Sequence, residues 1–467
     1  MSQKRIVYPY IPNSVPEIKA RMLKEVGARD IMDLYAEIPD DLILKRKMDL
    51  PEPILDEYSL KRHLEEILDR NRNCDDHLNF LGAGCAQHHV PAVCDEISSR
   101  GEFVTAYVGE PYADHGKWQA LFEYASLMGE LLDMDVLSCP LYDGPAAAAT
   151  SLRMASRTTG RSEVLVPGSA SPDLMAVVRN YLGGIGEPQV SIRTIGFDPG
   201  SGLLDLDQLR SSVSSNTAAV LIENPGYLGN IETQAEEIGE IARNAGAEFV
   251  VYTDPISLGV LAPPAHYGGT FACGDFQPLG MHIQCGGGQG GFIATHDDMR
   301  YVAEFKDLMF GITETVRKGE WGFGEVLFDR TSYGSREQGK EYTGTTTGLW
   351  AITAGVYLAL MGPQGMEEIG RTILQKSQYA AREMARIPGV RVASETPFFK
   401  EFVVNFDGTG KSVGEINAAL LDRKIFGGKD LSREFPELGQ SALYCVTERI
   451  TQDDIHTLAQ VLGECCS

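Results

Sequence analysis

The sequence predicts an α/β protein organised around a mostly parallel β-sheet with helices on both faces. From about residue 136 to residue 253, short apolar segments of strand length alternate with segments of helical periodicity. Strands that alternate with helices are joined by crossover connections, which make neighbouring strands parallel. Because ligands bind at the carboxyl ends of such strands, we expect a functional site there. The clearest strand candidates are VLVP at 164–167, TAAVLIE at 217–223 and FVVYT at 249–253.

Three loops follow predicted strands and should meet at that edge of the sheet, namely residues 142–146, 224–229 and 254–257. In the first loop, Asp143 and Gly144 precede a run of small residues that opens a helix. Exposed N–H groups at such a helix start can hold a phosphate, but small residues serve helix–sheet packing equally well. Both interpretations stay open at this point.

Length and composition indicate a folded protein of several parts. The 467 residues exceed what one small core holds, and the 43% hydrophobic and 23% charged residues exclude a disordered or fibrous chain. The formal net charge of −24 argues against a nucleic-acid partner, because phosphate binding requires clustered lysine and arginine. We therefore expect no contact with nucleic acid.

Cysteine spacing and apolar runs bear on metal binding and on location. None of the 9 cysteines forms a C-x-x-C pair, and no histidine spacing matches a zinc site, so we expect free thiols and no bound metal. The first residues lack the apolar core of a signal peptide, and no uninterrupted apolar run reaches about 18 residues. These features predict a cytoplasmic protein without membrane contact.

Changes in composition along the chain predict three parts. Residues 1–75 are polar and interrupted by prolines, and their short helical patterns predict an arm over a larger body or, alternatively, a small helical cap. Residues 76–340 carry the α/β pattern. Residues 341–467 predict a connecting helix and a small C-terminal α+β domain, in which strand candidates such as VRVAS and EFVVNF alternate with helices.

The stretch from Asp254 to Gly291 bears most directly on chemistry. Asp254 follows a buried strand, and no lysine occurs between Asp254 and Lys306. In pyridoxal-phosphate enzymes of the aspartate-aminotransferase-like class, an aspartate at such a position pairs with the pyridinium nitrogen, and a lysine some tens of residues later forms a Schiff base with the cofactor. The stretch therefore looks like half of such a site.

Nearly the whole chain resembles one known family. Its motifs are YIPNS at 10–14, LKRKMDLP at 44–51, FLGAG at 80–84, VPAVCDEI at 90–97, QALFEY at 119–124, YDGPAAAA at 142–149, ENPGYLG at 223–229, DPISLGVLAPPAHYG at 254–268 and GVYLALMGPQG at 355–365. The most specific of them is the one that starts at Asp254. With these motifs the chain resembles the alpha subunit of the two-subunit glycine decarboxylase, the P-protein of the glycine cleavage system.

The resemblance implies a fold, an activity and several partners. Members have the pyridoxal-phosphate fold-type I architecture, in which a smaller C-terminal α+β domain follows the large α/β domain. In the two-subunit form, a beta subunit holds pyridoxal phosphate on its Schiff-base lysine, and the alpha subunit completes the shared active site. The implied activity is that of glycine dehydrogenase (decarboxylating, aminomethyl-transferring), an oxidoreductase of glycine catabolism. The implied partners are the lysine-bearing beta subunit, in a heterodimer or heterotetramer, the lipoyl H-protein and a small amino-acid substrate.

The resemblance also implies roles for particular residues. Gln277 stands near the place of the missing lysine, and its amide nitrogen is not a nucleophile, so the chain has no catalytic residue of its own. Tyr107, Thr345 and Thr346 are expected to reach the partner's pocket, since hydroxyl groups beside glycines can donate hydrogen bonds to a phosphate. The alternative for the threonines is a structural role, in a turn and as a helix cap.

Three further residues have a structural interpretation beside the functional one. Asp143 and Asp254 are interpreted as remnants of a duplicated site, so they are vestigial candidates for cofactor binding. Arg449 is a candidate for binding the substrate carboxylate by its position, and a surface ion pair is the competing interpretation.

Two segments differ from the family pattern, at 107–116 and at 341–350. Both fall where contact with cofactor or substrate is implied, so the identity of the substrate stays open. One alternative is a paralogous pyridoxal-phosphate decarboxylase subunit that acts with its partner on another amino acid or amine. Another is a non-catalytic scaffold subunit that keeps the fold for assembly.

Overall fold

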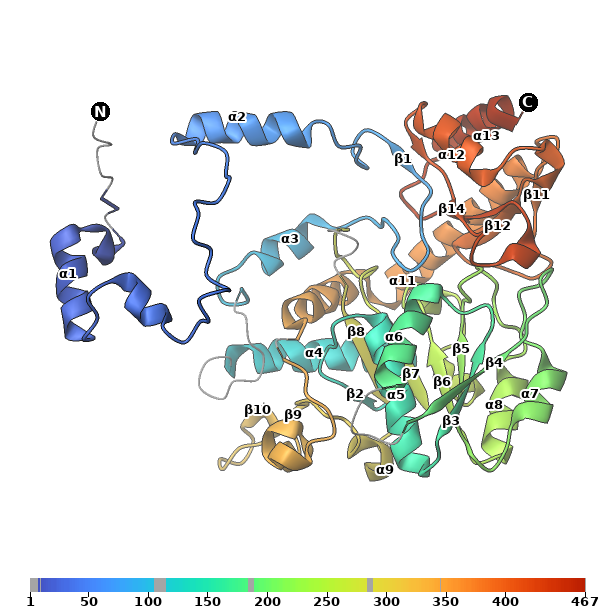
Figure 1. Cartoon of the computed structure of the whole chain (residues 1–467). Coiled ribbons are helices and arrows are strands. Elements are labelled where there is room, and N and C mark those ends of the chain that lie inside the picture. The colour runs from blue at the N-terminus through green and yellow to red at the C-terminus, as the bar shows by residue number, and fades with distance from the viewer. Residues whose placement is uncertain are drawn as a thin grey trace. The chain divides into compact units, whose positions relative to one another are not determined.

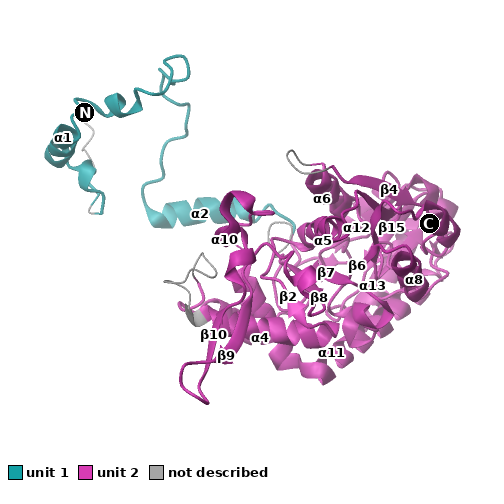
Figure 2. Ribbon diagram, turned by 90° about the horizontal axis from the view of Figure 1, so that it is seen from below, with its two compact units in different colours: residues 1–72 teal, residues 73–467 magenta. Residues whose placement is uncertain are grey.

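The computed structural model describes residues 7–8, 10–104, 115–183, 189–283, 289–344 and 346–466 of the chain. The chain divides into two compact units, unit 1 at residues 1–72 and unit 2 at residues 73–467 (Figure 2). The finer division of the larger part into residues 76–340 and 341–467 stays a prediction.

Unit 1 contains two helices, α1 at Pro16–Glu25 and α2 at Glu57–Leu68, with 3₁₀ helices at Pro12–Ser14 and Ile31–Tyr35. Proline suits the first turn of α1, where the missing N–H would have no partner. Asp56 caps α2 by accepting a hydrogen bond of 2.7 Å from the N–H of Ser59. No described residue of unit 1 is buried, and the apolar side chains of α2 lie exposed. The described residues of unit 1 therefore form no core.

Unit 2 is built on a seven-stranded sheet with the strand order β2-β8-β7-β6-β5-β3-β4 (Figure 1). The five strands from β4 to β7 pair in parallel, whereas β8 is antiparallel to both β7 and β2. The prediction of a mostly parallel sheet is thus confirmed. The strands are β2 Val136–Leu137, β3 Glu163–Pro167, β4 Ser191–Ile195, β5 Thr217–Glu223, β6 Glu248–Tyr252, β7 Phe271–Asp275 and β8 Gly291–Thr295.

Helices cover both faces of this sheet because alternate residues of its strands enter two different cores. Ala219 and Leu221 of β5 pack with α5 and α6, whereas Val220 and Ile222 pack with α7 and α8. The near-continuous apolar strands read from the sequence follow from this burial on both sides. The helices are α5 Gly144–Thr159, α6 Pro172–Leu182, α7 Leu206–Ser212 and α8 Ala235–Asn244.

A further core joins α4 to the long helix α11 and to the sheet. Gly362 has φ of +58° inside α11 and Pro363 follows it, so two helical stretches meet there at a break. The segment between β8 and α11 contains an antiparallel hairpin that the sequence pattern did not predict. The elements concerned are α3 Ala92–Ser98, α4 His115–Leu132, α9 Met299–Val302, β9 Phe310–Glu314, β10 Trp321–Glu325, α10 Ser332–Ser335 and α11 Gly348–Met384.

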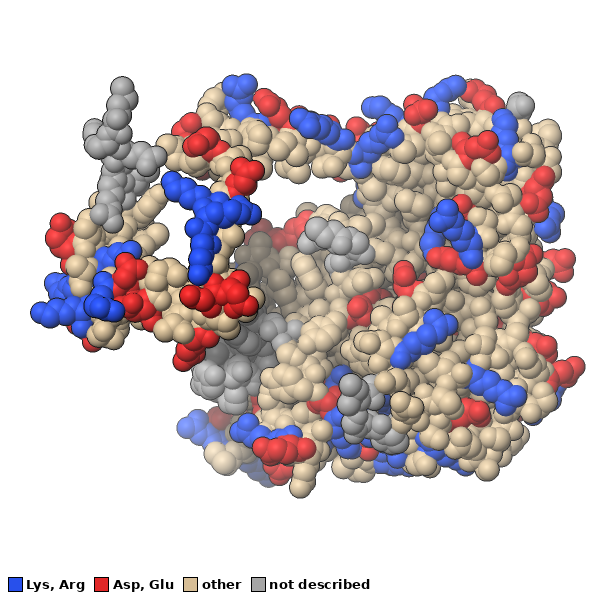
Figure 3. All heavy atoms as spheres, in the orientation of Figure 1, with Lys and Arg blue, Asp and Glu red and all other residues tan. Residues whose placement is uncertain are grey.

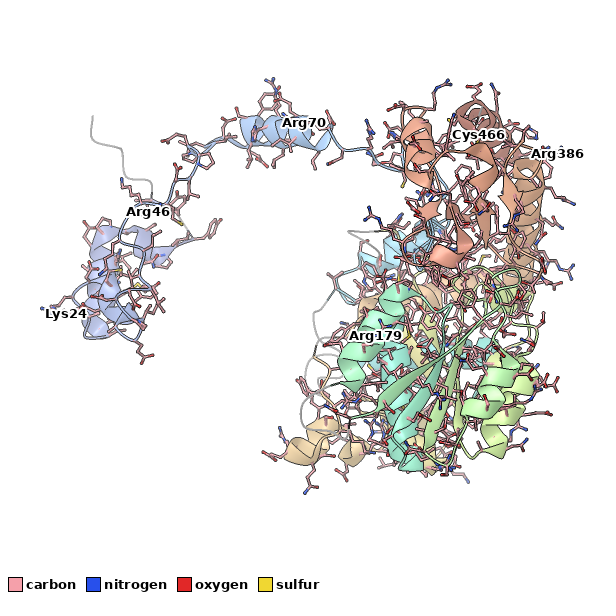
Figure 4. All side chains as sticks on the ribbon, turned by 45° about the vertical axis from the view of Figure 1, so that its right-hand side comes forward. Lys24, Arg46, Arg70, Arg179, Arg386 and Cys466 are labelled. Carbon is pink, nitrogen blue, oxygen red and sulfur yellow. The ribbon has the colours of Figure 1, made fainter. Side chains whose placement is uncertain are left out.

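The C-terminal part of unit 2 has a four-stranded antiparallel sheet, in the order β11-β12-β15-β14, with its own apolar core. Arg386, just beyond α11, lies in this part with Cys466 of α13, whereas Arg179 is an exposed residue of α6 in the part that carries the large sheet (Figure 4). The elements are β1 Leu78–Asn79, β11 Arg391–Val392, β12 Glu401–Asn405, α12 Val413–Leu421, β13 Ile425–Phe426, β14 Lys429–Asp430, β15 Ser441–Cys445 and α13 Gln452–Cys466. The predicted α+β character is confirmed.

Acidic and basic side chains lie interspersed over the face drawn in Figure 3. Among the helices of the described residues, none combines the length and the apolar character that crossing a membrane requires.

Candidate active site

A cavity of about 320 Å³ lies at the carboxyl ends of β5, β6 and β7. Each of the three loops expected to meet there contributes to its wall, through Asp143, Gly226 and Asp254 respectively. Residues 83–86 and 399–401 also line it, from other parts of unit 2. The parallel sheet therefore brings the predicted loops together around one pocket.

Asp254, which follows β6, forms a partly buried ion pair with Lys400. The Lys400 Nζ and the Asp254 Oδ2 are 2.7 Å apart, and the two side chains are only 12% and 16% exposed. Burial opposes the positive charge of Lys400, but the carboxylates of Asp254 and Glu401 raise the pKa of its ammonium group above the usual value. Lys400 thus stays protonated and pairs with Asp254.

Behind this pair, the amine of Lys400 also lies 3.5 Å from the Nε2 of His88. The Nδ1 of His88 is 2.9 Å from the carboxylate of Glu448. Burial opposes the charge on Glu448, but the hydrogen bond from His88 holds its pKa down at about 2. Lys400 therefore belongs to a network of polar contacts that also includes Asp254, His88 and Glu448.

Two carboxylates occupy the N-terminus of α5. Asp143 caps the helix by accepting a 2.7 Å hydrogen bond from the N–H of Ala146. Asp275, at the end of β7, accepts from the N–H of Gly144 at 2.9 Å. It also accepts from the N–H groups of Gln277 at 2.9 Å and Gly290 at 3.3 Å. The helix start that could have held a phosphate already has anionic partners.

Gln277 lies two residues beyond the end of β7, and its side chain is buried, with only 1% exposed. Its Nε2 donates to the carbonyl of Met281 at 3.0 Å. Its Oε1 accepts a 3.7 Å hydrogen bond from the thiol of Cys85. Both ends of the amide are therefore engaged with the protein.

A second polar cluster fixes the start of the threonine-rich segment at 341–347. Glu341 accepts hydrogen bonds from Lys306 at 2.7 Å and from Arg157 at 3.2 Å, and Arg153 lies 3.2 Å away. Glu304 in turn pairs with Arg157 at 2.7 Å. Burial opposes the charge on Glu341, but Lys306 and the two arginines hold its pKa below the usual value.

The rest of this segment is tied to the loop that precedes α5. The N–H of Gly344 donates to the hydroxyl of Tyr142 at 2.9 Å, and the hydroxyl of Thr347 donates to the carbonyl of Leu141 at 2.6 Å. Thr347 occupies the N-cap position of α11, yet its side chain makes no capping bond. The hydroxyl of Thr346 lies 3.9 Å from the thiol of Cys139. The described residues of the segment are therefore held at both of its ends.

Comparison with known proteins decides the family. The model of the glycine cleavage system P-protein family matches residues 9–462 of the chain. A probable glycine dehydrogenase (decarboxylating) subunit 1 from Staphylothermus marinus is 37% identical, over 98% of each chain. A protein of the same description from Carboxydothermus hydrogenoformans is 36% identical, over 97% of this chain and 99% of the relative.

The chain belongs to the glycine cleavage system P-protein family.

Solved structures agree with this membership. An inhibitor-bound glycine decarboxylase (P-protein) of the glycine cleavage system superposes with a TM-score of 0.85 and 33% identity, over 98% of this chain and all of that chain. A sphingosine-1-phosphate lyase from Burkholderia pseudomallei has a TM-score of 0.65 and 16% identity, over 90% of this chain and 92% of that one, and shows the fold alone. The predicted pyridoxal-phosphate fold-type I architecture is confirmed.

The pocket of this P-protein family member does not fit pyridoxal phosphate. That cofactor requires an amine that can lose its proton, a site for its phosphate and an acidic partner for its pyridinium nitrogen. Here Asp254 is paired with Lys400, and Asp143 and Asp275 already fill the N-terminus of α5. Among the described lining residues, six carboxyl side chains accompany a single lysine, which is itself paired with Asp254, so the lining offers no free cation to a phosphate.

The predicted site residues have different positions in the structure. Asp143 and Asp254 line the pocket, and Gln277 lies beside it. Thr346 lies half-buried against Cys139, outside the pocket lining, and Arg449 is exposed. Tyr107 and Thr345 lie outside the described residues.

Sequence reasoning missed the pocket residues Lys400 and Asp275. Asp275 ends an apolar strand just as Asp254 follows one, and that signal could have identified it. Lys400 immediately precedes β12, and a lysine at such a position normally indicates a solvated strand end. No local pattern indicates that Lys400 pairs with Asp254.

The buried Glu223, at the end of β5, should make the free energy of unfolding depend on pH. Burial raises the pKa of Glu223 to about 8, and burial raises the pKa of Asp275 to about 7. The folded state therefore keeps protons that the unfolded state releases above about pH 4. This contribution is present at low pH and is lost as the pH rises through these values, by up to about 1.4 kcal/mol per pH unit for each group.

We expect the free energy of unfolding, measured with urea, to fall between about pH 4 and about pH 8. Glu223→Gln should weaken that fall, because an amide does not titrate. Glu367→Gln on α11, where the carboxylate is 53% exposed, is the matched control and should leave the fall unchanged. An equal slope in Glu223→Gln and wild type would contradict this prediction.

Proposed function

We propose that this chain is the non-lysine subunit of a heteromeric glycine dehydrogenase (decarboxylating) and that it completes the active site of a partner subunit that holds pyridoxal phosphate. The observation that carries the proposal is the pocket at Asp254, whose carboxylate is paired with Lys400 and whose neighbour Gln277 has no nucleophilic amine. Two relatives more than a third identical along nearly their whole length are described as subunit 1 of this enzyme. That description implies a second subunit.

The exposed surface of unit 1 supports an assembly. Large apolar side chains such as Leu55, Leu64 and Leu68 lie exposed there, and no described residue of the unit is buried. Exposed apolar surface of this kind is typical of protein interfaces. A partner subunit would remove it from water.

In the proposed reaction, glycine loses its carboxylate as carbon dioxide, and its aminomethyl group passes to the lipoyl arm of H-protein. Pyridoxal phosphate, held by the partner, supplies the electron sink for decarboxylation. This chain contributes binding and orientation. The described residues of the segment at 341–347 are fixed by Glu341 at one end and by Thr347 at the other, which supports a role of the segment in orienting groups toward the shared site. Tyr107, Thr345 and Thr346 are the residues that we propose to reach the shared site.

Exchange of labelled bicarbonate into glycine tests the proposed function. We expect exchange when this chain is combined with a lysine-bearing subunit and H-protein, and none with either subunit alone. Thr346→Ala should lower the exchange rate at least about tenfold, the scale of one lost transition-state hydrogen bond. Thr346→Ser, which keeps the hydroxyl, should restore most of the rate.

Thr457→Ala, at an exposed threonine of α13, is the matched control and should keep the wild-type rate. An assembled complex that binds cofactor but exchanges no bicarbonate into glycine would contradict the substrate assignment. Equal rates in Thr346→Ala and wild type would contradict the role of Thr346.

A further inference from the structure

In the pocket of unit 2, the carboxylate of Asp254 and the N-terminus of α5 both have partners from the chain itself. At Asp254, the partner is the ammonium of Lys400 at 2.7 Å. At the first turn of α5, the partner of the Gly144 N–H is the carboxylate of Asp275 at 2.9 Å. A cation therefore faces the aspartate, and an anion faces the helix N-terminus, which is the charge pattern that each of these groups favours.

These two partners have the charges of the two ends of pyridoxal phosphate. In fold-type I enzymes a pyridinium nitrogen faces the aspartate, and a phosphate binds well at a helix N-terminus. We propose that Lys400 and Asp275 are built-in replacements for these two groups and that they exclude the cofactor independently of the residue at position 277. The inference deepens the proposed function, on which it rests, because it explains how one of two related pockets stays empty.

The missing lysine does not by itself explain exclusion. Without an imine, pyridoxal phosphate could still bind through its phosphate and its pyridinium nitrogen, since both contacts are noncovalent. In this pocket a phosphate would have to displace Asp275 from the N–H groups of Gly144, Gln277 and Gly290. It would also meet the carboxylate of Asp143 in the lining. Juxtaposed like charges of this kind cost several kcal/mol in binding.

Lys400 cannot serve as a substitute for the missing imine lysine. An imine forms only from a neutral amine, and the carboxylate of Asp254 keeps the Lys400 side chain in its ammonium form. The same ion pair leaves Asp254 without a free oxygen position for a pyridinium nitrogen on that side. One contact therefore blocks both requirements of the cofactor.

Restoring the pocket stepwise tests this inference. The full-length chain, alone and in the reconstituted complex, is incubated with pyridoxal phosphate and reduced with borohydride, and peptide mass spectrometry locates the pyridoxyl group. The variants are Gln277→Lys alone and Gln277→Lys/Lys400→Met/Asp275→Ser. The matched control is Gln277→Lys/Lys424→Met/Asp76→Ser, which makes the same substitutions at an exposed ion pair with a 4.0 Å separation.

We expect the variant with both charges removed to be labelled at position 277 at least about tenfold more than Gln277→Lys alone or the matched control, since removal of like charge is worth more than 1.4 kcal/mol. Equal labelling of Gln277→Lys and the variant with both charges removed would overturn the inference. So would a folded variant, judged by circular dichroism, that carries no label and binds no cofactor in equilibrium dialysis.

Single substitutions keep the test decisive if the combined variant does not fold. In the Gln277→Lys background, Lys400→Met and Asp275→Ser should each raise labelling, and the absence of an increase in both would overturn the inference. The proposed function fails separately, because it is contradicted only by label on the wild-type chain or by a complex without exchange activity.

Discussion

Replacing Glu341 with glutamine should lower the free energy of unfolding of unit 2 by about 3–5 kcal/mol, because removal of one partner leaves buried charges uncompensated. The Glu341 side chain is 7% exposed, and Lys306 beside it is 6% exposed. Arg153 and Arg157 share the same carboxylate. Glutamine would keep the shape of the side chain but leave these three cations without their common counterion.

The same change should also reduce catalysis in the reconstituted complex. Glu341 begins the segment that carries Thr346, so its loss should move the hydroxyl groups proposed to reach the shared site. We expect the exchange rate to fall at least about tenfold, since misplacement of positioning groups by about 1 Å can lower rates by more than that. Urea unfolding and bicarbonate exchange measure the two effects.

Glu367→Gln provides the matched control for Glu341. Glu367 pairs with Arg371 one turn along α11, where the two side chains are 53% and 67% exposed. An exposed pair of this kind contributes about 0–1 kcal/mol, so the control should unfold nearly as wild type. If Glu341→Gln were as stable as Glu367→Gln, the cluster around Glu341 would not anchor the segment.

Replacing Lys400 with methionine is the second change expected to have a large effect. It removes the only basic side chain among the described residues of the pocket lining and leaves Asp254 and Glu401 as buried acids. We expect a loss of about 3–5 kcal/mol in the free energy of unfolding, again because one buried charge loses its partner. Part of this loss should be relieved at low pH, where the acids can take up protons.

The double variant Asp254→Asn/Lys400→Met distinguishes the energy of the ion pair from the effect of changing the side chains' shapes. Since both charges are removed together, it should be more stable than Lys400→Met alone, with a coupling energy of about 0.5–3 kcal/mol between the two sites. Urea unfolding of wild type, both single variants and the double variant gives this energy. Additive effects of the two substitutions would mean that the 2.7 Å contact between Asp254 and Lys400 contributes nothing.

The sequence predicted the parts of the fold that depend on local pattern. The predicted run FVVYT overlaps β6, after which Asp254 lines the pocket, and the predicted run VLVP lies within β3. Apolar periodicity suffices for such elements because strand burial on both faces follows from the helix–strand alternation. The hairpin of β9 and β10 was missed, since none of its strand residues is buried and no continuous apolar run marks either strand.

The candidate site was only half predictable for a related reason. Asp254 and Asp143 follow strands and could be identified from the chain order alone. Their partners come from distant segments, as Lys400 does for Asp254, and no local pattern specifies such pairing. The choice between phosphate binding and simple packing at α5 was left open, and the structure shows that Asp143 and Asp275 fill the helix start.

Borohydride reduction of the assembled wild-type complex tests the central claim most directly. Reduction fixes any imine as a stable pyridoxyl-lysine, and peptide mapping assigns it to one subunit. We predict that the pyridoxyl group is found on a lysine of the partner subunit and on no lysine of this chain. Label on Lys400, the one lysine that lines the described pocket, would contradict the claim that this chain has no cofactor site of its own.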